Sequence, residues 1–282
     1  MSGLSRPNFL VIGGGVVACG PTAVTAMAQA GRGTESHGMS AFGDLGYPAN
    51  FAHLKYVDPA APKGGVFSQL AGAGTATFNS LNGFILKGDA AQDMELVFAS
   101  LMARANDEPD AIYALAAEKV EISADRRTYR FKLRDGIKFH DGSPITAADV
   151  AFSLTTLKEK GHPNIAMLLR DMEAAEADGD RVAVIRFSAQ RSHDTPLIAA
   201  RLPVLSQAYY ATRKFDETTL EPPLGSGPYR VGRFEQGRFL EFERVKDWWG
   251  TDLPVMRGQN NFDILRYDYY RDRDTAFEGF SA

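Results

Sequence analysis

The chain has 282 residues, of which 44% are hydrophobic and 23% charged, and its formal net charge is −4. This composition supports a sizeable core in one large domain or two lobes, argues against disorder, and provides no basic face for a nucleic acid. Cys19 is the only cysteine, so no disulfide can form within the chain.

Residues 1–30 have the features of a secretory leader. Arg6 is the only charged residue among the first 31, an apolar stretch follows at 9–18, and two overlapping A-x-A cleavage signals lie at 26–30. The apolar stretch is too short to span a bilayer, which takes about 20 residues. We therefore predict a signal peptide over 1–30 and a periplasmic location. The alternative is lipidation of Cys19, which ends the lipobox-like sequence VVAC.

A dinucleotide-binding turn is the competing interpretation of the same stretch. Gly13, Gly15 and Ala18 fit a loose G-x-G-x-x-G/A pattern, which requires a following helix and then a strand that ends in an acidic residue. Pro21 lies where the helix would run, and Glu35 follows no apolar strand. The context therefore favours the leader.

The first elements after the leader are a strand, a loop and a helix. The segment VFSQLAG at 66–72 predicts a short strand, and 75–88 has the polar, aromatic composition of a loop. From Asp89 onward, apolar residues recur at helical spacing, and Asp89 is a suitable N-cap. We therefore predict a helix over 89–104, with apolar positions Met94, Val97, Phe98, Leu101 and Met102.

The most regular pattern lies at 128–161. Apolar and charged residues alternate over 128–133, which predicts a half-exposed strand, and Asp-Gly turns follow at 135–136 and 141–142. Thr146 and Asp149 form a capping-box pattern with a short acid, and Gly161 lies at the expected end. We predict a helix between them.

Strands and helices continue to alternate irregularly toward the C-terminus. We predict a strand at 181–188, short helices at 195–206 and 206–215, a hairpin at 229–245 that turns near Gly237, a strand at 262–270 and a helix starting within 271–280. Because strict βαβ alternation is absent, we expect an α/β fold with mixed sheets.

Catalytic and metal-binding motifs are not evident. The histidines show no metal-ligand spacing, so we expect no metal and no cofactor. Gly225-Ser226-Gly227 is similar to part of a nucleophile elbow, but G-x-S-x-G is absent and Pro228 follows. We expect a binding protein rather than an enzyme; a secreted hydrolase that uses Ser226 is an alternative.

Five segments carry a family resemblance. The sequence LRDGIKFHDGSPITAADVAFSL at 133–154 closely resembles the signature of the family 5 extracellular solute-binding proteins, the peptide- and nickel-binding components of ABC importers. LGSGPYRV at 224–231 is similar to a second conserved strand entry of that family, and VKDWWG at 245–250 to a later turn. The sequence at 35–65, with FNSLNGFILKG at 78–88, resembles the YejA-type branch, associated with oligopeptide and microcin C uptake.

The resemblance implies a periplasmic binding protein fold of type II with mixed sheets. It implies that residues 31–282 hold the first lobe with its subdomain, and that the second lobe is truncated. Its implied partners are an oligopeptide ligand and an inner-membrane ABC permease, and we expect a monomer. A non-functional remnant of such a protein is a further alternative.

The resemblance also implies where a ligand binds. In peptide-binding relatives, the loop after the first strand offers backbone groups to an extended peptide, which corresponds here to Leu86, Lys87 and Gly88. The aromatic residue of the later turn corresponds to Trp248, which would cover ligand side chains, although a core position is an equal alternative for it. We expect the glycines of Gly225-Ser226-Gly227 to serve backbone freedom in a structural turn.

Overall fold

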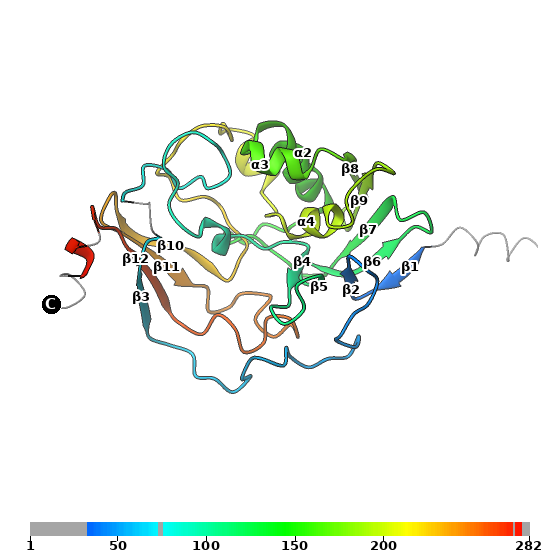
Figure 1. The fold of residues 1–282 in the computed structure, drawn as a ribbon, viewed down its shortest axis with the longest axis horizontal. Coiled ribbons are helices and arrows are strands. Elements are labelled where there is room, and N and C mark those ends of the chain that lie inside the picture. Colours follow the sequence, from blue (N-terminus) through cyan, green and yellow to red (C-terminus); the bar gives the residue numbers. More distant parts are fainter. Residues whose placement is uncertain (1–32, 73–75, 273, 278–282) are drawn as a thin grey trace, which may run out of the picture. The chain divides into compact units, whose positions relative to one another are not determined.

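A computed structural model describes residues 33–72, 76–272 and 274–277. The predicted leader, with Cys19 and the glycines of the competing dinucleotide turn, lies outside the described residues. Glu35 lies on strand β1 (Thr34–Ser36) and forms an exposed ion pair with Lys119, 2.6 Å between Nζ and Oε1. In the part of the chain that the structure describes, the strands form three sheets (Figure 1).

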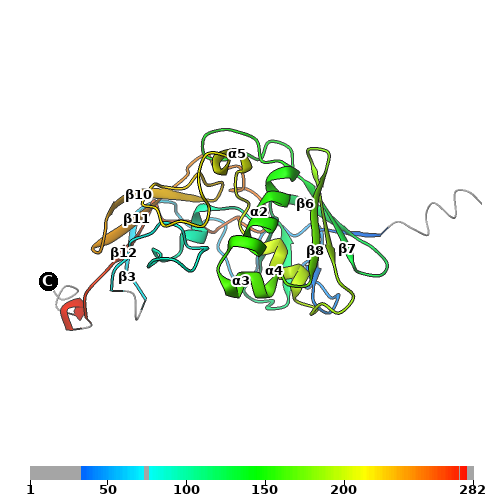
Figure 2. The same cartoon turned by 90° about the horizontal axis from the view of Figure 1, so that it is seen from above.

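The largest sheet has five antiparallel strands. Their spatial order is β1, β6 (Ala117–Ile122), β7 (Thr128–Leu133), β9 (Val182–Phe187) and β8 (Met172–Asp178). Helix α2 (Ala147–Lys160) packs against β8 and β9, which Figure 2 shows from above. The predicted strands at 128–133 and 181–188 are confirmed within this sheet.

The other two sheets are smaller. One has the order β10 (Tyr229–Glu235), β11 (Phe239–Arg244), β12 (Ile264–Asp268) and β3 (Val66–Leu70), with β12 and β3 parallel and the other pairs antiparallel. The other has the order β2 (Gly38–Ser40), β5 (Ala111–Ala114) and β4 (Met102–Arg104), all antiparallel. The prediction of mixed sheets in an α/β fold is confirmed.

Helix α2 forms where the capping box predicts it. The Thr146 side chain accepts from the Asp149 amide at 3.4 Å, and Asp149 Oδ2 accepts from the Thr146 amide at 2.9 Å. Two orphan amide groups of the first turn are satisfied in this way. The helix ends at Gly161, whose amide donates to the Leu157 carbonyl. Asp149 Oδ1 also accepts from the Gln207 amide at 2.9 Å and so ties α2 to the next chain segment.

The predicted turns at glycine are also present. Gly136, Gly142 and Gly237 all have positive φ, between 75° and 88°, where a residue without Cβ is favoured. Gly237 connects β10 to β11, so the predicted hairpin is confirmed. The short helices α4 (Thr195–Arg201) and α5 (Gln207–Tyr210) confirm the two predicted between 195 and 215, whereas α3 (Pro163–Leu168) is an additional helix.

The predicted helix over 89–104 is wrong. A single 3-10 turn, η1 (Met94–Val97), is followed by extended chain and strand β4. Asp93 has a left-handed backbone with φ 54°, which is incompatible with a continuous right-handed helix. The Ala99 amide donates to Ser226 Oγ, and the Ala99 carbonyl accepts from the Val204 amide. Partners distant in sequence therefore replace the hydrogen bonds that a helix would make.

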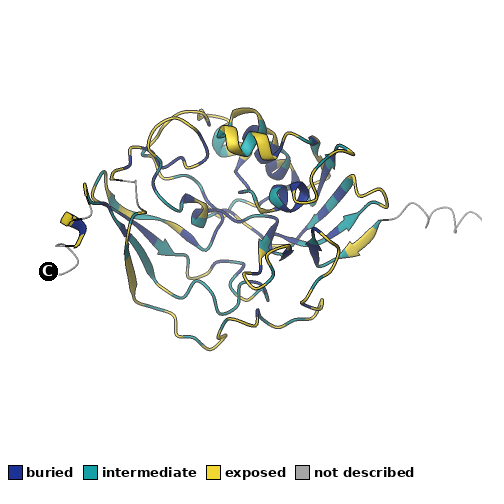
Figure 3. Ribbon diagram, in the orientation of Figure 1, coloured by how far each residue is buried: buried dark blue, intermediate teal, exposed yellow. Residues whose placement is uncertain are grey.

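Two buried clusters form the core. The larger one extends from the five-stranded sheet to the four-stranded one and contains all five apolar residues that suggested a helix at 89–104. The smaller one contains Tyr47, Tyr113 and Trp248, with Tyr47 and Tyr113 in edge-to-face contact at 5.4 Å. Figure 3 shows that most strands mix buried and partly exposed residues, whereas β3 has no buried residue and is mostly exposed. Among the described residues, no helix is long and apolar enough to cross a membrane.

Candidate functional site

The loop that follows β3 is closed at its neck by hydrogen bonds. The amides of Asn79 and Ser80 both donate to the Asp89 carbonyl, at 2.9 and 3.1 Å, and the Asp89 amide donates to Asn79 Oδ1 at 2.8 Å. Asp89 therefore closes this loop instead of capping a helix. We refer to residues 79–89 as the ligand loop, after the role that the family resemblance leads us to expect for its tip.

The tip of the ligand loop, Leu86–Lys87–Gly88, is exposed, with Leu86 66% accessible. Among the described residues, no hydrogen bond engages the backbone N–H or C=O of these three positions. Gly88 has φ +77°, and a Cβ there would lie 2.6 Å from both Asn79 Oδ1 and Thr218 Cγ2. The tip thus offers free backbone donors and acceptors, while Gly88 allows close packing beneath it.

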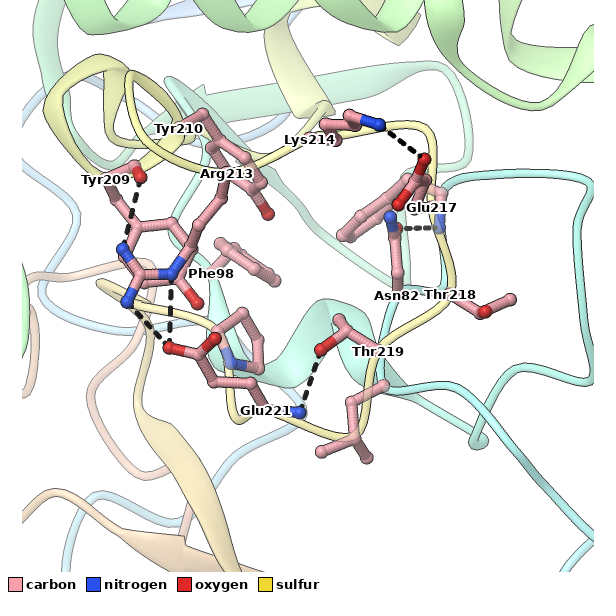
Figure 4. Close-up of a pocket in the computed structure, with 13 residues that line it drawn as sticks. Asn82, Phe98, Tyr209, Tyr210, Arg213, Lys214, Glu217, Thr218, Thr219 and Glu221 are labelled. Carbon is pink, nitrogen blue, oxygen red and sulfur yellow. Dashed lines mark hydrogen bonds and ion pairs between the residues drawn. The ribbon is translucent and has the colours of Figure 1, made fainter.

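A cavity of about 300 Å³ lies beside the ligand loop (Figure 4). The ligand loop, Phe98 and the segment 209–223 form its walls. Two hydrogen bonds hold these segments together: the Leu81 amide donates to the Thr219 carbonyl at 2.7 Å, and Asn82 Nδ2 donates to the Phe215 carbonyl at 2.6 Å. The lining residues are Leu81, Asn82, Phe84, Phe98, Tyr209, Tyr210, Arg213, Lys214, Glu217, Thr218, Thr219, Glu221 and Pro223.

Two ion pairs lie on opposite sides of the cavity in Figure 4. Arg213 Nη2 contacts Glu221 Oε1 at 2.7 Å, and Lys214 Nζ contacts Glu217 Oε1 at 3.0 Å. The hydrogen bond between the first two raises the pKa of Arg213 and lowers the pKa of Glu221. The Arg213 guanidinium also lies over the Tyr209 ring, 4.1 Å from its centroid. The charges of the cavity wall therefore neutralise one another.

The apolar part of the cavity is aromatic. Phe84 and Phe98 make an edge-to-face pair with centroids 5.4 Å apart, and Tyr209 and Tyr210 a second at 5.0 Å. Tyr210 also contacts Phe215 at 5.5 Å, and burial raises its pKa above the ordinary value, so the phenol is neutral at physiological pH. These rings present their faces and edges to the cavity without adding charge.

Trp248 occupies a different environment. It is buried in the smaller cluster, does not line the cavity, and its indole N–H donates to the Ser226 carbonyl at 2.8 Å. Gly250 lies against its ring, where a Cβ would be 2.5 Å from Cη2. The crevice beside Trp248 has about 10 Å³ of space, room for about one water molecule and not for a ligand side chain. The structure thus places Trp248 apart from the predicted contacts of the ligand loop.

The segment Gly225-Ser226-Gly227 is built into the core next to η1. The amides of Ser226 and Gly227 both donate to the Val97 carbonyl, and Ser226 Oγ accepts from the Ala99 amide at 3.0 Å. Ser226 is fully buried, which leaves no room for a substrate at its hydroxyl. Neither glycine has positive φ, so the expectation of backbone freedom is wrong. Close packing requires glycine at position 225 instead, because a Cβ there would collide with the Val97 carbonyl oxygen.

His140 supports the same segment from the other side. Its Nε2 donates to the Gly227 carbonyl at 2.9 Å, and its backbone amide donates to the Gly225 carbonyl at 2.8 Å. Burial lowers the pKa of His140, since the imidazolium would lose its hydration. Across the described ranges, no group of three or more His, Cys, Asp or Glu side chains is placed to hold a metal ion.

The cavity is the feature that the sequence interpretation missed. Two of its walls, the ligand loop and Phe98, are close in sequence and carried sequence predictions, whereas the third, 209–223, lies more than a hundred residues further along the chain. The signals in 209–223 are weak: two adjacent tyrosines, then two basic residues followed by three acidic ones. Such a run is as typical of a solvated loop as of a binding wall.

The structural comparisons establish the fold class. The chain superimposes on the oligopeptide-binding protein AppA of Bacillus subtilis, solved in complex with a nonapeptide, with a TM-score of 0.60 and 20% identity over 78% of this chain and 42% of AppA. NikZ of Campylobacter jejuni, solved in complex with Ni(L-His), gives a TM-score of 0.60 and 19% identity over 77% of this chain and 41% of NikZ. The fold is that of a type II periplasmic binding protein.

Sequence comparisons give the family. Residues 111–282 match the model of the bacterial extracellular solute-binding proteins, family 5. A putative binding protein of Brucella melitensis is 37% identical over 98% of this chain and 45% of its own length. The probable peptide-binding protein YejA of Agrobacterium fabrum is 34% identical over 87% of this chain and 40% of its own length. The peptidoglycan-binding protein YepA of the same bacterium is 36% identical over 97% of this chain and 44% of its own length.

The chain belongs to the family 5 extracellular solute-binding proteins, as its motifs predict. It spans about half the length of the curated relatives it matches. The YejA-type resemblance is confirmed by the relatives of that name.

Proposed function

We propose that this chain forms part of the periplasmic substrate-binding component of an ABC importer that binds oligopeptides and delivers them to a membrane permease. The observation that carries the proposal is the tip of the ligand loop. Three consecutive exposed residues, Leu86, Lys87 and Gly88, have backbone groups that no other described residue engages. An extended peptide can pair with such a segment by main-chain hydrogen bonds, which do not depend on its sequence.

The names of two relatives support a peptide-containing ligand. One is a probable peptide-binding protein and the other a peptidoglycan-binding protein, and both align with most of this chain. Peptides of the microcin C type are one class of candidate, and peptides derived from peptidoglycan are another. All share a peptide backbone, which is the group that the loop tip is suited to bind.

The structure gives no support to the hydrolase alternative. Ser226 is fully buried and its hydroxyl accepts from the Ala99 amide. We therefore propose a binding role without catalysis. For Trp248 we propose a structural role, because its ring is buried and its N–H is satisfied by the Ser226 carbonyl. Export to the periplasm and a monomeric state are part of the same proposal.

An NMR titration of the isotope-labelled 282-residue chain tests this function. Tetra-alanine and a peptidoglycan-derived muropeptide serve as ligands, and free glutamate serves as a control without a peptide backbone. We expect a saturable shift of the amide signals of Leu86, Lys87 and Gly88 with at least one peptide and none with glutamate. Peptide concentrations in the millimolar range that leave these three signals unmoved would contradict the proposal.

A further inference from the structure

We propose that the cavity beside the ligand loop receives an uncharged aromatic side chain of the ligand. The inference rests on the proposed function for the identity of that ligand as a peptide. It concerns a different set of residues, because neither the loop tip nor Trp248 lines the cavity. Its support comes from the position, the charge and the lining of the cavity.

The position of the cavity suits a side chain of a peptide held at the loop tip. Leu81, Asn82 and Phe84 belong to the ligand loop and line the cavity. Thr218, which lines the cavity from the segment 209–223, lies so close to Gly88 that a Cβ there would be 2.6 Å from Thr218 Cγ2. A peptide backbone paired with the tip therefore passes beside the cavity mouth, where one of its side chains can enter.

The charge of the wall favours an uncharged group. Arg213 is paired with Glu221 and Lys214 with Glu217, so the two positive and two negative charges cancel. A charged side chain that entered would have to replace a partner in one of these pairs. Asn82, the buried polar residue of the wall, is also satisfied: Nδ2 donates to the Phe215 carbonyl and Oδ1 accepts from the Phe84 amide. The charged and amide side chains of the wall therefore all have partners, whereas the Thr218 hydroxyl has none among the described residues.

The lining and the volume favour an aromatic ring. The rings of Phe84, Phe98, Tyr209 and Tyr210 can meet an incoming ring face to edge, a geometry that stabilises aromatic pairs beyond the burial of area. The volume of about 300 Å³ lies at the lower end of the range for ligand pockets, which suits one side chain rather than a whole ligand. Phenylalanine, tyrosine and tryptophan are the side chains that meet these conditions.

The test uses blocked single amino acids, which carry a side chain but cannot bind as an extended peptide. N-acetyl-phenylalanine amide is titrated into the labelled 282-residue chain, beside the alanine, lysine and aspartate analogues. We expect shifts at Thr218 and Thr219, and binding of the phenylalanine compound about tenfold tighter than that of the others. Equal binding of all four compounds, or an absence of shifts at these threonines, would overturn the inference.

A blocked cavity provides the second arm. Thr218→Trp fills the mouth without removing a hydrogen bond, because none of the described residues bonds to the Thr218 side chain. Ala211→Trp is the matched control, since Ala211 is exposed on the same segment and does not line the cavity. We expect Thr218→Trp to weaken binding of the phenylalanine compound at least fivefold and Ala211→Trp to leave it unchanged. Unchanged binding in Thr218→Trp would refute the assignment.

The two proposals fail separately. If the cavity assignment is wrong but the function is right, tetra-alanine still shifts the loop-tip amides while the phenylalanine compound shows no preference. If the function is wrong but the cavity binds rings, the phenylalanine compound still shifts the amide signals of Thr218 and Thr219, while peptides do not shift the amide signals of the loop tip. Circular dichroism melts of both variants confirm that each is folded before binding is compared.

Discussion

Gly88 lies against Thr218 so closely that a Cβ at position 88 would be 2.6 Å from Thr218 Cγ2. This contact joins the ligand loop to the segment 209–223 that lines the cavity, although 130 residues separate the two positions. Gly88 also has φ +77°, a backbone conformation that residues with a Cβ adopt at a cost. The absence of a side chain at position 88 thus serves both conformation and packing.

We expect Gly88→Ala to destabilise the protein by about 2 kcal/mol, roughly half from the left-handed backbone and half from the clash. Gly136→Ala is the control, because Gly136 has φ +75° but open space around it. It should cost about 1 kcal/mol, the conformational part alone. Urea unfolding measures both values, and equal costs for the two variants would show that the contact with Thr218 carries no energy.

Asp149 shares the capping box with Thr146 and has a second role that Thr146 lacks. Its Oδ2 completes the capping box of α2 and its Oδ1 accepts from the Gln207 amide. We expect Asp149→Ala to cost about 2–3 kcal/mol and Thr146→Ala about 1 kcal/mol, since the first leaves amides unsatisfied at two places. Denaturant unfolding of the two variants gives the comparison; a larger loss in Thr146→Ala would contradict this account.

Ser226→Ala distinguishes a structural serine from a nucleophile. Removal of the hydroxyl leaves the buried Ala99 amide without its acceptor, which should cost about 1–3 kcal/mol of unfolding free energy. Peptide binding at the loop tip should stay within about twofold of the unchanged chain. An esterase or peptidase activity that disappears in this variant would revive the hydrolase alternative.

Stability should fall in mild acid through His140. Burial lowers its pKa in the folded state below the unfolded value of about 6.5, so the unfolded chain binds more protons there. The contribution is therefore fully present above pH 6.5 and is lost as the pH falls from about 6.5 toward the lower folded pKa. The charge of Asp141 favours protonation of His140 and that of Arg230 opposes it, but burial is the largest influence on the pKa of His140.

His140→Gln tests this origin, because glutamine can donate to the Gly227 carbonyl but does not titrate. We expect the loss of unfolding free energy between pH 7.5 and pH 5 to be smaller in His140→Gln than in the unchanged chain. Urea unfolding at both pH values provides the measurement. An equal loss in both proteins would assign the pH dependence to other groups.

Glu221→Gln tests the charge balance of the cavity. It leaves Arg213 without its carboxylate partner, so the wall gains one net positive charge. Binding of N-acetyl-aspartate amide should then tighten by about three- to tenfold, while the phenylalanine compound changes little. No gain for the aspartate compound would mean that the ion pairs do not set the preference.

The sequence by itself determined the features whose hydrogen bonds close within a few residues. The capping box at Thr146 and Asp149, the glycine turns and the β10–β11 hairpin depend on neighbours along the chain, and they form where the pattern predicts them. The segment 133–154, which holds the capping box and two of the glycine turns, also carried the family resemblance, because its motif is contiguous in sequence.

Only the tertiary structure decided the rest. The apolar spacing at 89–104 could not separate a helix from extended chain, because the nearly continuous buried run at 97–102 satisfies both patterns. Its hydrogen bonds to Val204 and Ser226 are long-range, and the local sequence pattern does not predict them. The cavity has the same origin: the ligand loop and the segment 209–223 lie far apart in sequence, so its volume does not exist until the chain has folded.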